Sequence, residues 1–306
     1  MSTRCAGAAS PAPATPTTER VATIETVEAL GPLRERVSGW KRGGLRVALV
    51  PTMGNLHAGH FALVELARSH ADRVVASVFV NPTQFGPNED FARYPRTPER
   101  DAEGLAAAGC DLLWLPSLET MYPYGADRAV RMRVPGITDV LDGAHRPGHF
   151  DGVATVVARL FNQVQADVAA FGRKDYQQLA VIRYLVRDLA FPVELLAAQT
   201  VREADGLAMS SRNQYLDAGE RVRAPRIHQT LLSMRDALRG GQAPAAVEAA
   251  ATSGLREDGF EVDYAVVRRA DLSETDGVAG AGAYVALVAA RLGRTRLIDN
   301  LEFALD

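Results

Sequence analysis

Between residues 45 and 200 the chain alternates between two hydrophobic patterns. Short, strongly apolar runs rich in branched residues predict strands buried on both faces. The segments between these runs place apolar residues three and four positions apart, which is the spacing of amphipathic helices. The predicted strands are 45–50, 73–80, 111–115, 166–171 and 191–198, and the predicted helices are 57–70, 99–108, 152–165 and 176–190.

This alternation predicts an α/β fold with a doubly wound parallel sheet. In such sheets ligands bind beyond the carboxyl ends of the strands. The loops at 51–60, 81–98 and 172–178 follow predicted strands or begin predicted helices, so these loops are where chemistry is expected.

The pattern changes after about residue 200. An Ala- and Arg-rich helical stretch at 218–257 precedes three strand-like segments, and the Gly/Ala-rich run at 276–283 predicts a loop between two of them. The strand-like segments are 260–268, 283–290 and 295–299. We therefore expect a first domain at 21–200 and a smaller α+β domain at 201–306.

The first 20 residues are rich in Ala, Pro, Ser and Thr and hold no unbroken apolar segment, so residues 1–20 are predicted to be a disordered tail. Elsewhere no uncharged apolar stretch reaches the roughly 18 residues that a membrane-spanning helix needs. The two cysteines, Cys5 and Cys110, cannot form a disulfide framework, which fits a cytoplasmic protein.

Composition and charge narrow the partners. Hydrophobic residues make up 47% and charged residues 23% of the 306 positions, as in ordinary globular proteins. The formal net charge is −3, so the chain has no overall positive field with which to hold a polyanion. Nucleic acid is therefore not expected as the main partner.

The segment PTMGNLHAGH at 51–60 carries the first candidate site. A predicted strand stops, the chain turns at Gly54, and a helix is predicted to begin near Leu56. His57 and His60 then lie on one face of the first helical turn. Unpaired backbone N–H groups at a helix amino terminus attract anions, and two imidazoles add aimed donors. This arrangement suits a polyphosphate.

Gly59 stands between the two histidines. A glycine inside a helix costs about 1 kcal/mol, and its use here would be to let a flat adenine or ribose approach the backbone. A zinc site built on His57 and His60 is an alternative, but it lacks a third nearby ligand.

The second candidate site is VREADGLAMSSRN at 201–213. Met209, Ser210, Ser211 and Arg212 offer hydroxyls, backbone N–H donors and a permanent positive charge, all of which bind phosphate. A Ser-Ser-Arg turn taken alone is more often a solvated loop or a helix cap. Paired with the earlier His-Ala-Gly-His segment, it resembles the HIGH and KMSKS elements of the nucleotidyltransferase superfamily.

Seven separated blocks narrow the resemblance to one family. In chain order they are PTMGNLHAGH at 51–60, FVNPTQFG at 79–86, YPRT at 94–97, RPGHFDGV at 146–153, FGRKDYQQL at 171–179, TVREADGLAMSSRNQYL at 200–216 and RLGRTRLIDN at 291–300. Together they resemble pantothenate synthetases, the pantoate–β-alanine ligases, over nearly all of residues 45–300.

The resemblance implies an enzyme that condenses pantoate with β-alanine at the expense of ATP, through a pantoyl-adenylate, and releases AMP and pyrophosphate. It also implies Mg²⁺, a Rossmann-like first domain, a carboxy-terminal lid over ATP and a homodimer. A nucleotidyltransferase that makes a dinucleotide would share the His-x-Gly-His element but not the paired amides Gln84 and Gln178. A non-catalytic nucleotide-binding module would be basic and would lack a phosphate-neutralising group, unlike this chain.

Residue roles follow from the resemblance. The catalytic groups it implies are His57, His60, Lys174, Ser210, Ser211 and Arg212. The implied ATP contacts are Pro51, Thr52, Met53, Gly59, Gly172, Asp175, Val201 and Met209. Pantoate would be held by Gln84 and Gln178, and the β-alanine and pyrophosphate region would be lined by Asn81, Tyr94, Arg146 and His149.

Two positions stay open at this stage. Asp101 matches a carboxylate near the Mg²⁺–pyrophosphate site of the family, but an acidic residue on a helix face is the commoner explanation. Arg173 stands where the family usually has Glu, so the charge beside Lys174 is reversed. Arg173 either points into the cleft, where it would attract ATP, or points outward and changes only a surface or dimer contact.

Overall fold

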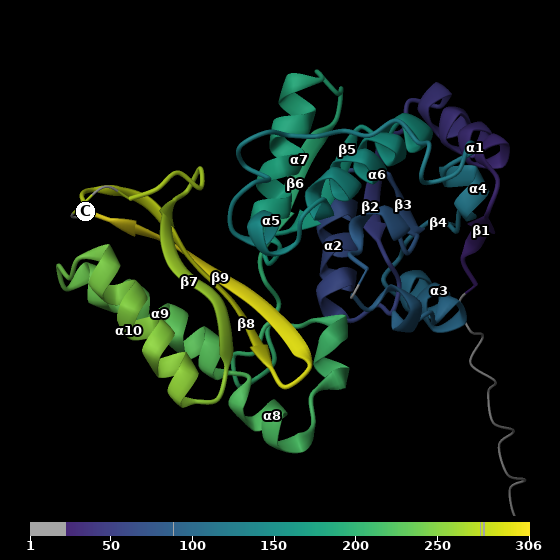
Figure 1. Ribbon diagram of the computed structural model, residues 1–306. Helices are drawn as coiled ribbons and strands as arrows, with labels where there is room; N and C mark the ends of the chain where they lie inside the picture. The colour runs from purple at the N-terminus through teal and green to yellow at the C-terminus, as the bar shows by residue number, and fades with distance from the viewer. Residues whose placement is uncertain (1–22, 88, 276, 278) are drawn as a thin grey trace, which may run out of the picture.

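The computed structural model describes residues 23–87, 89–275, 277 and 279–306 of the chain (Figure 1). The tail predicted at 1–20 lies outside the described residues. Two sheets organise the described chain, one of six strands and one of three. No helix in these ranges is both long and apolar enough to cross a membrane.

The six-stranded sheet is parallel throughout. Its strands are β1 (Glu25–Val27), β2 (Val47–Thr52), β3 (Arg73–Val78), β4 (Leu112–Trp114), β5 (Val168–Gly172) and β6 (Glu194–Ala198). The five strands predicted between residues 45 and 200 are confirmed to within a few residues. Strand β1 was not predicted, because its three residues are mostly exposed and carry no apolar run.

The strand order β1-β4-β3-β2-β5-β6 contains one topological switch point, between β2 and β5. From β2 the chain proceeds outward through β3 and β4, whereas β5 and β6 are added on the other side. Ala48 and Leu49 of β2 pair with Val168 and Ala169 of β5. Connections leave these two strands toward opposite faces of the sheet, which opens a crevice at their carboxyl ends.

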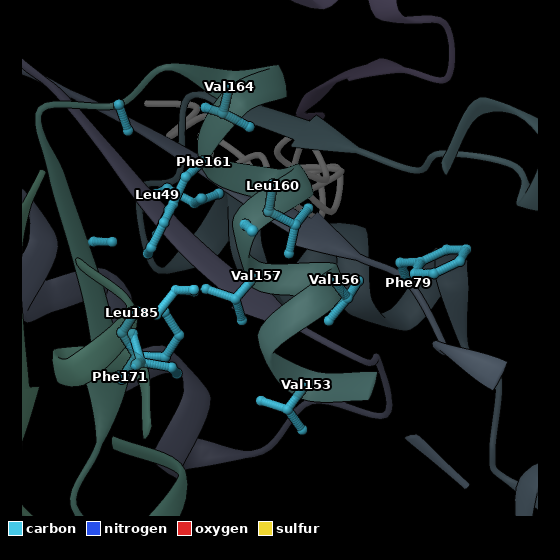
Figure 2. Close-up of a cluster of buried hydrophobic side chains, with 14 of the residues drawn as sticks. Leu49, Phe79, Val153, Val156, Val157, Leu160, Phe161, Val164, Phe171 and Leu185 are labelled. Atoms are coloured by element: carbon cyan, nitrogen blue, oxygen red, sulfur yellow. The ribbon is translucent and has the colours of Figure 1, made fainter. Parts of the chain in front are cut away.

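Helices cover both faces of this sheet, as a doubly wound fold requires. On one face lie α1 (Leu30–Arg42), α6 (His149–Val164) and α7 (Tyr176–Asp188), and on the other lie α2 (Ala58–Arg68) and α3 (Pro98–Ala107). The alternation along β2 assigns Leu49 to the α6 side and Val50 to the α2 side. Figure 2 shows the α6 side chains, among them Val157 and Leu160, packed with Leu49 and Phe171.

The second unit is a three-stranded antiparallel sheet with helices on one face, which confirms the predicted α+β character. Its elements are α8 (Ala218–Arg223), α9 (Arg226–Arg239), α10 (Pro244–Glu257), β7 (Glu261–Arg269), β8 (Gly282–Leu292) and β9 (Thr295–Leu305). The last strand was predicted to end at 299, but β9 continues to Leu305. Its polar residues stay in the strand because their main chain pairs with β8. In the loop predicted at 276–283, residues 276 and 278 lie outside the description.

The three-stranded sheet packs between its own helices and the first unit. Tyr284 and Val288 of β8 belong to the core shared with α9 and α10, whereas Val285 and Leu287 form a cluster with Tyr176 of α7. The remaining short elements are α4 (Leu118–Met121), α5 (Asp142–His145), η1 (Pro82–Gln84), η2 (Phe91–Arg93) and η3 (Ser211–Tyr215).

A buried ion pair joins the two units. Arg296 of β9 donates from Nη2 to Oδ1 of Asp142 in α5 at 2.6 Å and from Nε to Oδ2 of Asp263 at 2.7 Å. The Tyr264 hydroxyl donates to the same Asp142 oxygen at 2.9 Å. These contacts hold the second unit beside the carboxyl edge of the parallel sheet.

Candidate active site

The loop after β2 is shaped by a buried carboxylate. Gly54 and Asn55 have positive φ angles of 86° and 51°, which turn the chain sharply at the position expected. The backbone N–H groups of Asn55 and Leu56 donate to the two oxygens of Asp101 at 2.9 and 2.8 Å, and Asp101 is only 1% exposed. In this structure Asp101 therefore holds the loop in shape.

Two histidines cap helix α2 with their own side chains. His57 is the N-cap residue, close to the predicted start, and its Nδ1 accepts from the N–H of Gly59 at 3.1 Å. Nδ1 of His60 accepts from the backbone N–H of His57 at 3.3 Å. Because both Nδ1 atoms act as acceptors, each neutral ring carries its proton on Nε2.

Burial keeps this pair neutral. It is the main cause that lowers the pKa of His57 to about 4 and that of His60 to about 3, and the nearby Lys174 ammonium adds to both effects. The ring centroids are 4.1 Å apart. At neutral pH the pair therefore presents two Nε2–H donors without positive charge.

Gly59 has a structural reason of its own. A Cβ at this position would lie 2.9 Å from Cε1 of the His57 ring, closer than side chains tolerate. The glycine is thus required for the histidine cap, a reason that differs from the nucleotide approach inferred from the sequence.

Lys174 lies directly after β5, across the switch point from the histidine pair. Its side chain is 19% exposed, and its one ion pair within the described ranges is a long one, 4.0 Å from Nζ to Oδ1 of Asp175. Asp175 precedes helix α7 without capping it and is half-exposed. Lys174 is therefore a mostly buried positive charge that is weakly neutralised by the protein.

The loop at 209–212 crosses the same cleft. Oγ of Ser210 accepts from the N–H of Arg212 at 3.2 Å and begins η3, while Oγ of Ser211 donates to the Asn55 carbonyl at 3.0 Å. Arg212 donates from Nε and Nη2 to the two oxygens of Asp90, both at 3.1 Å. The loop is thus clasped to the first unit at two points.

The side chain of Asn81 orients Gln84 through hydrogen bonds. Asn81 is 1% exposed and donates from Nδ2 to Oε1 of Gln84 at 3.0 Å and to the carbonyl of Gly152 at 3.2 Å. Its Oδ1 accepts from the Tyr122 hydroxyl at 2.7 Å. Gln84 donates from Nε2 to Sδ of Met53 at 3.2 Å, a weak partner. Asn81 therefore orients Gln84, and the Gln84 amide keeps donor capacity for a ligand.

Gly152 allows this arrangement and was not singled out from the sequence. A Cβ at Gly152 would lie 2.3 Å from the carbonyl oxygen of Thr83 and 2.6 Å from Cα of Gln84. Only glycine lets helix α6 approach the segment that carries Gln84 this closely. The sequence feature that could have pointed to Gly152 is its place in the RPGHFDGV block, but this block does not show that Gly152 packs against Thr83 and Gln84.

Arg146 and His149 form a closed network beside that segment. Arg146 donates to both carboxylate oxygens of Glu89 at 2.6 and 2.7 Å. Nδ1 of His149 lies 2.8 Å from the Gln84 carbonyl, which can only accept, so Nδ1 carries the proton and Nε2 accepts from Arg146 Nη1 at 2.9 Å. Burial, with the help of Arg146, lowers the pKa of His149 to about 4.

The cleft between the two units brings the predicted residues together. Its inner cavity, about 220 Å³, is lined by all of them except two: Pro51, Thr52, Met53, His57, Gly59, His60, Asn81, Gln84, Tyr94, Gly172, Lys174, Asp175, Gln178, Val201, Met209, Ser210, Ser211 and Arg212. Arg146 and His149 line the adjoining cavity of about 370 Å³, which extends to β9. Gln84, Gln178 and Lys174 border both cavities.

Arg173 points outward from the cleft. Its Nη1 donates to Oε2 of Glu302 on β9 at 2.7 Å, and its Nε donates to the Ala197 carbonyl at 3.4 Å. Of the two orientations open from the sequence, the structure has the outward one.

The fold and the cleft define an α/β protein with a ligand cavity at the switch point of its parallel sheet, lined by His57, His60, Lys174 and Arg212. The sequence profile of the pantoate-β-alanine ligase family matches residues 24–302. The chain belongs to this family and is a ligase that joins pantoate and β-alanine to form pantothenate.

Relatives and solved structures agree with this membership. The pantothenate synthetase of Xanthomonas axonopodis pv. citri is 68% identical over 280 residues, which cover 92% of this chain and all of the relative. The crystal structure of pantothenate synthetase from Thermus thermophilus superposes with a TM-score of 0.83 at 49% identity, covering 91% of this chain and 99% of that one. Pantoate-β-alanine ligase from Francisella tularensis, solved with β,γ-ATP and β-alanine, gives 0.76 at 30% identity, covering 91% and 97%.

Proposed function

We propose that the inner cavity makes pantothenate in two steps through a pantoyl-adenylate. In the first step the pantoate carboxylate attacks the α-phosphorus of ATP in line, and pyrophosphate leaves. In the second step the β-alanine amine attacks the activated carbonyl, and AMP leaves. The observation that carries this proposal is the neutral His57–His60 pair facing the same cavity as the weakly paired Lys174.

The charges in the cavity support attack at a phosphate. The neutral Nε2–H groups can donate hydrogen bonds to a phosphate oxygen as its negative charge grows, without the imidazoles losing a proton. Lys174 supplies the positive charge. Ser210, Ser211 and Arg212 close the cavity from the other side. In the Francisella relative, the ATP analogue and β-alanine are bound to a protein of the same fold.

The remaining groups suit recognition rather than covalent chemistry. The amides of Gln84 and Gln178 offer donors and acceptors to the pantoate hydroxyls and carboxylate without adding charge. We expect Asp175 to accept from the ribose hydroxyls. The residues expected to contact the nucleotide, all of which line the inner cavity, are Pro51, Thr52, Met53, Gly59, Gly172, Val201 and Met209. Asn81 and His149 act as supports for the amide and for Arg146.

A covalent acyl-enzyme is not part of the proposal. Cys110 is buried in the core, and burial raises the pKa of its thiol to about 12. Neither Ser210 nor Ser211 is hydrogen-bonded to a histidine within the described part of the chain, since Ser210 Oγ accepts from the N–H of Arg212 and Ser211 Oγ donates to the Asn55 carbonyl. Activation of pantoate therefore falls to ATP.

The donors present fit a Mg²⁺ ion that ATP itself carries. Among the described residues no three His, Cys, Asp or Glu side chains cluster as a metal cage. Asp101 already accepts backbone N–H groups, and Asp90 accepts from Arg212. Mg²⁺ commonly binds through phosphate oxygens and water with few protein ligands. When bound, it would neutralise phosphate charge next to Lys174 and Arg212.

The larger assembly is part of the same proposal. Residues 201–306 serve as a lid over the cleft formed by 21–200, and the enzyme acts as a cytoplasmic homodimer. Support for the dimer comes from large apolar side chains exposed on the first unit, since exposed apolar groups mark contact surfaces. Tyr124 is 76%, Val130 72% and Leu118 49% exposed.

The chain provides a matched test of this function. It contains only two lysines, Lys41 and Lys174, and Lys41 pairs with Asp167 on the surface. With ATP, Mg²⁺, pantoate and β-alanine, the enzyme should form AMP and pantothenate in equal amounts. Lys174→Ala should lower kcat by roughly 100-fold, the scale for losing one group at a developing charge, whereas Lys41→Ala should not. Equal activity of both variants would remove Lys174 from the mechanism.

A further inference from the structure

Strand β9 reaches into the active site through one buried amide. Asn300 is 5% exposed, and its Nδ2 donates to the backbone carbonyls of Arg173 at 2.9 Å and of Lys174 at 2.7 Å. Both amide hydrogens are therefore used on two successive carbonyls, and both bonds cross from the second unit to the loop that carries Lys174.

Asp299, the preceding residue on β9, supports the turn before the Met209–Arg212 loop. Asp299, 4% exposed, accepts from Nη1 and Nη2 of Arg202 at 2.6 and 3.0 Å. Arg202 also donates to the Gly206 carbonyl at 3.1 Å and pairs through its backbone with Ala208. This braces the turn that leads into the Met209–Arg212 loop.

Successive side chains of a strand point to opposite sides, so β9 lies between the two elements and contacts each with a different residue. Asn300 is the contact on the lysine side. Among the residues that the structure describes, the Lys174 ammonium has no carboxylate closer than that of Asp175, which is 4.0 Å away. Its position therefore depends mainly on the backbone from which the side chain extends, and Asn300 holds that backbone.

We propose that Asn300 is a positioning residue for Lys174, so that the lysine reaches its working position only when β9 is docked against the first unit. This inference rests on the proposed role of Lys174 in adenylation. It assigns a task to the RLGRTRLIDN block, whose Asn300 touches neither the inner nor the adjoining cavity.

The chemistry requires an amide at this position. A carboxylate would place acceptor oxygens against two carbonyl acceptors, and an alanine would leave both carbonyls without their donor. Either change loosens the peptide of Lys174, and a displacement of about 1 Å in a catalytic group can cost roughly 100-fold in rate.

The test is a double-mutant cycle on the full-length enzyme. Asn300→Asp should lower the rate of pyrophosphate formation at least about 10-fold while the KM for β-alanine stays unchanged. Lys174→Ala should lower the rate more, and adding Asn300→Asp to Lys174→Ala should change it by less than about 2-fold, because the positioned group is already gone.

A second variant and a matched control sharpen the cycle. Asn300→Ala removes the donors without burying a charge and takes the place of Asn300→Asp if that variant does not fold, as judged by its melting curve. Glu302→Gln breaks the Arg173–Glu302 contact on the same strand and should leave kcat unchanged, since it does not touch the Lys174 carbonyl.

A pH profile separates positioning from simple loss of structure. The carboxyl of Asn300→Asp, buried against carbonyls, gains a donor when protonated. Its activity relative to the unsubstituted enzyme should therefore rise as the pH falls from 8 to 6, and that of Asn300→Ala should not.

The failures are distinguishable. If Lys174→Ala keeps full turnover, the proposed function of Lys174 fails. If Lys174→Ala is impaired but Asn300→Asp and Asn300→Ala are fully active, or if the losses multiply in the double variant, Asn300 does not act through Lys174 and the inference is overturned.

Discussion

Arg212 and Asp90 form a two-point ion pair across the cleft, with both N–O distances at 3.1 Å. The side chains are 32% and 19% exposed, so the pair is partly shielded from solvent. In this state the arginine proposed to meet the departing pyrophosphate is already neutralised by a carboxylate from the loop after β3. The triphosphate must therefore compete with Asp90 for the same guanidinium.

This competition predicts the effect of Asp90→Asn. Removing a negative charge next to a polyanionic ligand should strengthen ATP binding by roughly 3- to 10-fold, and more at low ionic strength. Calorimetric titration with ATP measures this, and Asp139→Asn, which removes a surface carboxylate paired with Arg133, serves as control. Weaker binding would instead mean that Asp90 holds Arg212 in its phosphate-binding orientation.

The histidine cap predicts a second result. His60→Ala should lower turnover by roughly 100-fold, since one aimed donor at the phosphate is lost. It also removes half of the capping box of α2, so the free energy of unfolding should fall by about 1 kcal/mol. Steady-state assays and denaturant titration report the two effects separately. Near-normal turnover in a folded variant would exclude His60 from the reaction.

Three partly buried imidazoles predict a particular pH dependence of stability. The pKa values of His57 and His149 are lowered to about 4 and that of His60 to about 3, below the ordinary 6.5 of the unfolded chain. Above about pH 6.5 neither state binds these protons, so their contribution to stability is complete. As the pH falls below 6.5 the unfolded state takes protons that the native state refuses, and stability should decline toward pH 4.

Proton NMR of the histidine rings checks this point, with each signal assigned through its substitution variant. The rings of His57, His60 and His149 should not titrate between pH 8 and 5.5. A pKa near 6.5 for His57 or His60 would contradict the neutral pair on which the proposed phosphate contacts depend.

The outward orientation of Arg173 predicts that Arg173→Glu leaves the KM for ATP within about 2-fold at low ionic strength, because the side chain faces Glu302. Both side chains are about one-third exposed, so the loss of stability should stay below about 1 kcal/mol. Exchanging the charges with Glu302→Arg should restore it. A large rise in KM that salt reduces would place the guanidinium in reach of ATP.

The fold was largely predictable from the sequence because its central strands are buried on both faces and its helices are amphipathic. The apolar runs at 45–50 and 166–171 correspond to β2 and β5, whose adjacency places the site. Strand β1 was not predicted because an edge strand of three mostly exposed residues has no hydrophobic pattern. The full length of β9 was not predicted because its polar residues are held in the strand by pairing with residues of β8, which the local pattern does not show.

The sequence predicted which residues line the cavity but not the contacts that hold them in place. The resemblance to pantothenate synthetases assigned His57, His60 and Lys174 to one cleft, and they line one cavity. It could not show that Asp90 neutralises Arg212, that Gly152 admits Gln84, or that Asn300 holds the Lys174 backbone. Each of these is a contact between segments far apart in the sequence, and such contacts depend on the packed fold.

The most direct test of the central claim omits β-alanine. With ATP, Mg²⁺ and pantoate alone, the enzyme should release close to one pyrophosphate per active site and retain pantoyl-adenylate, because the proposed lid would shield the intermediate from water. Radiolabelled pyrophosphate should then exchange into ATP, and the exchange should require the free carboxylate of pantoate. If ADP and phosphate formed instead, the attack would be at the γ-phosphorus, and the adenylating role of His57, His60 and the 209–212 loop would be wrong.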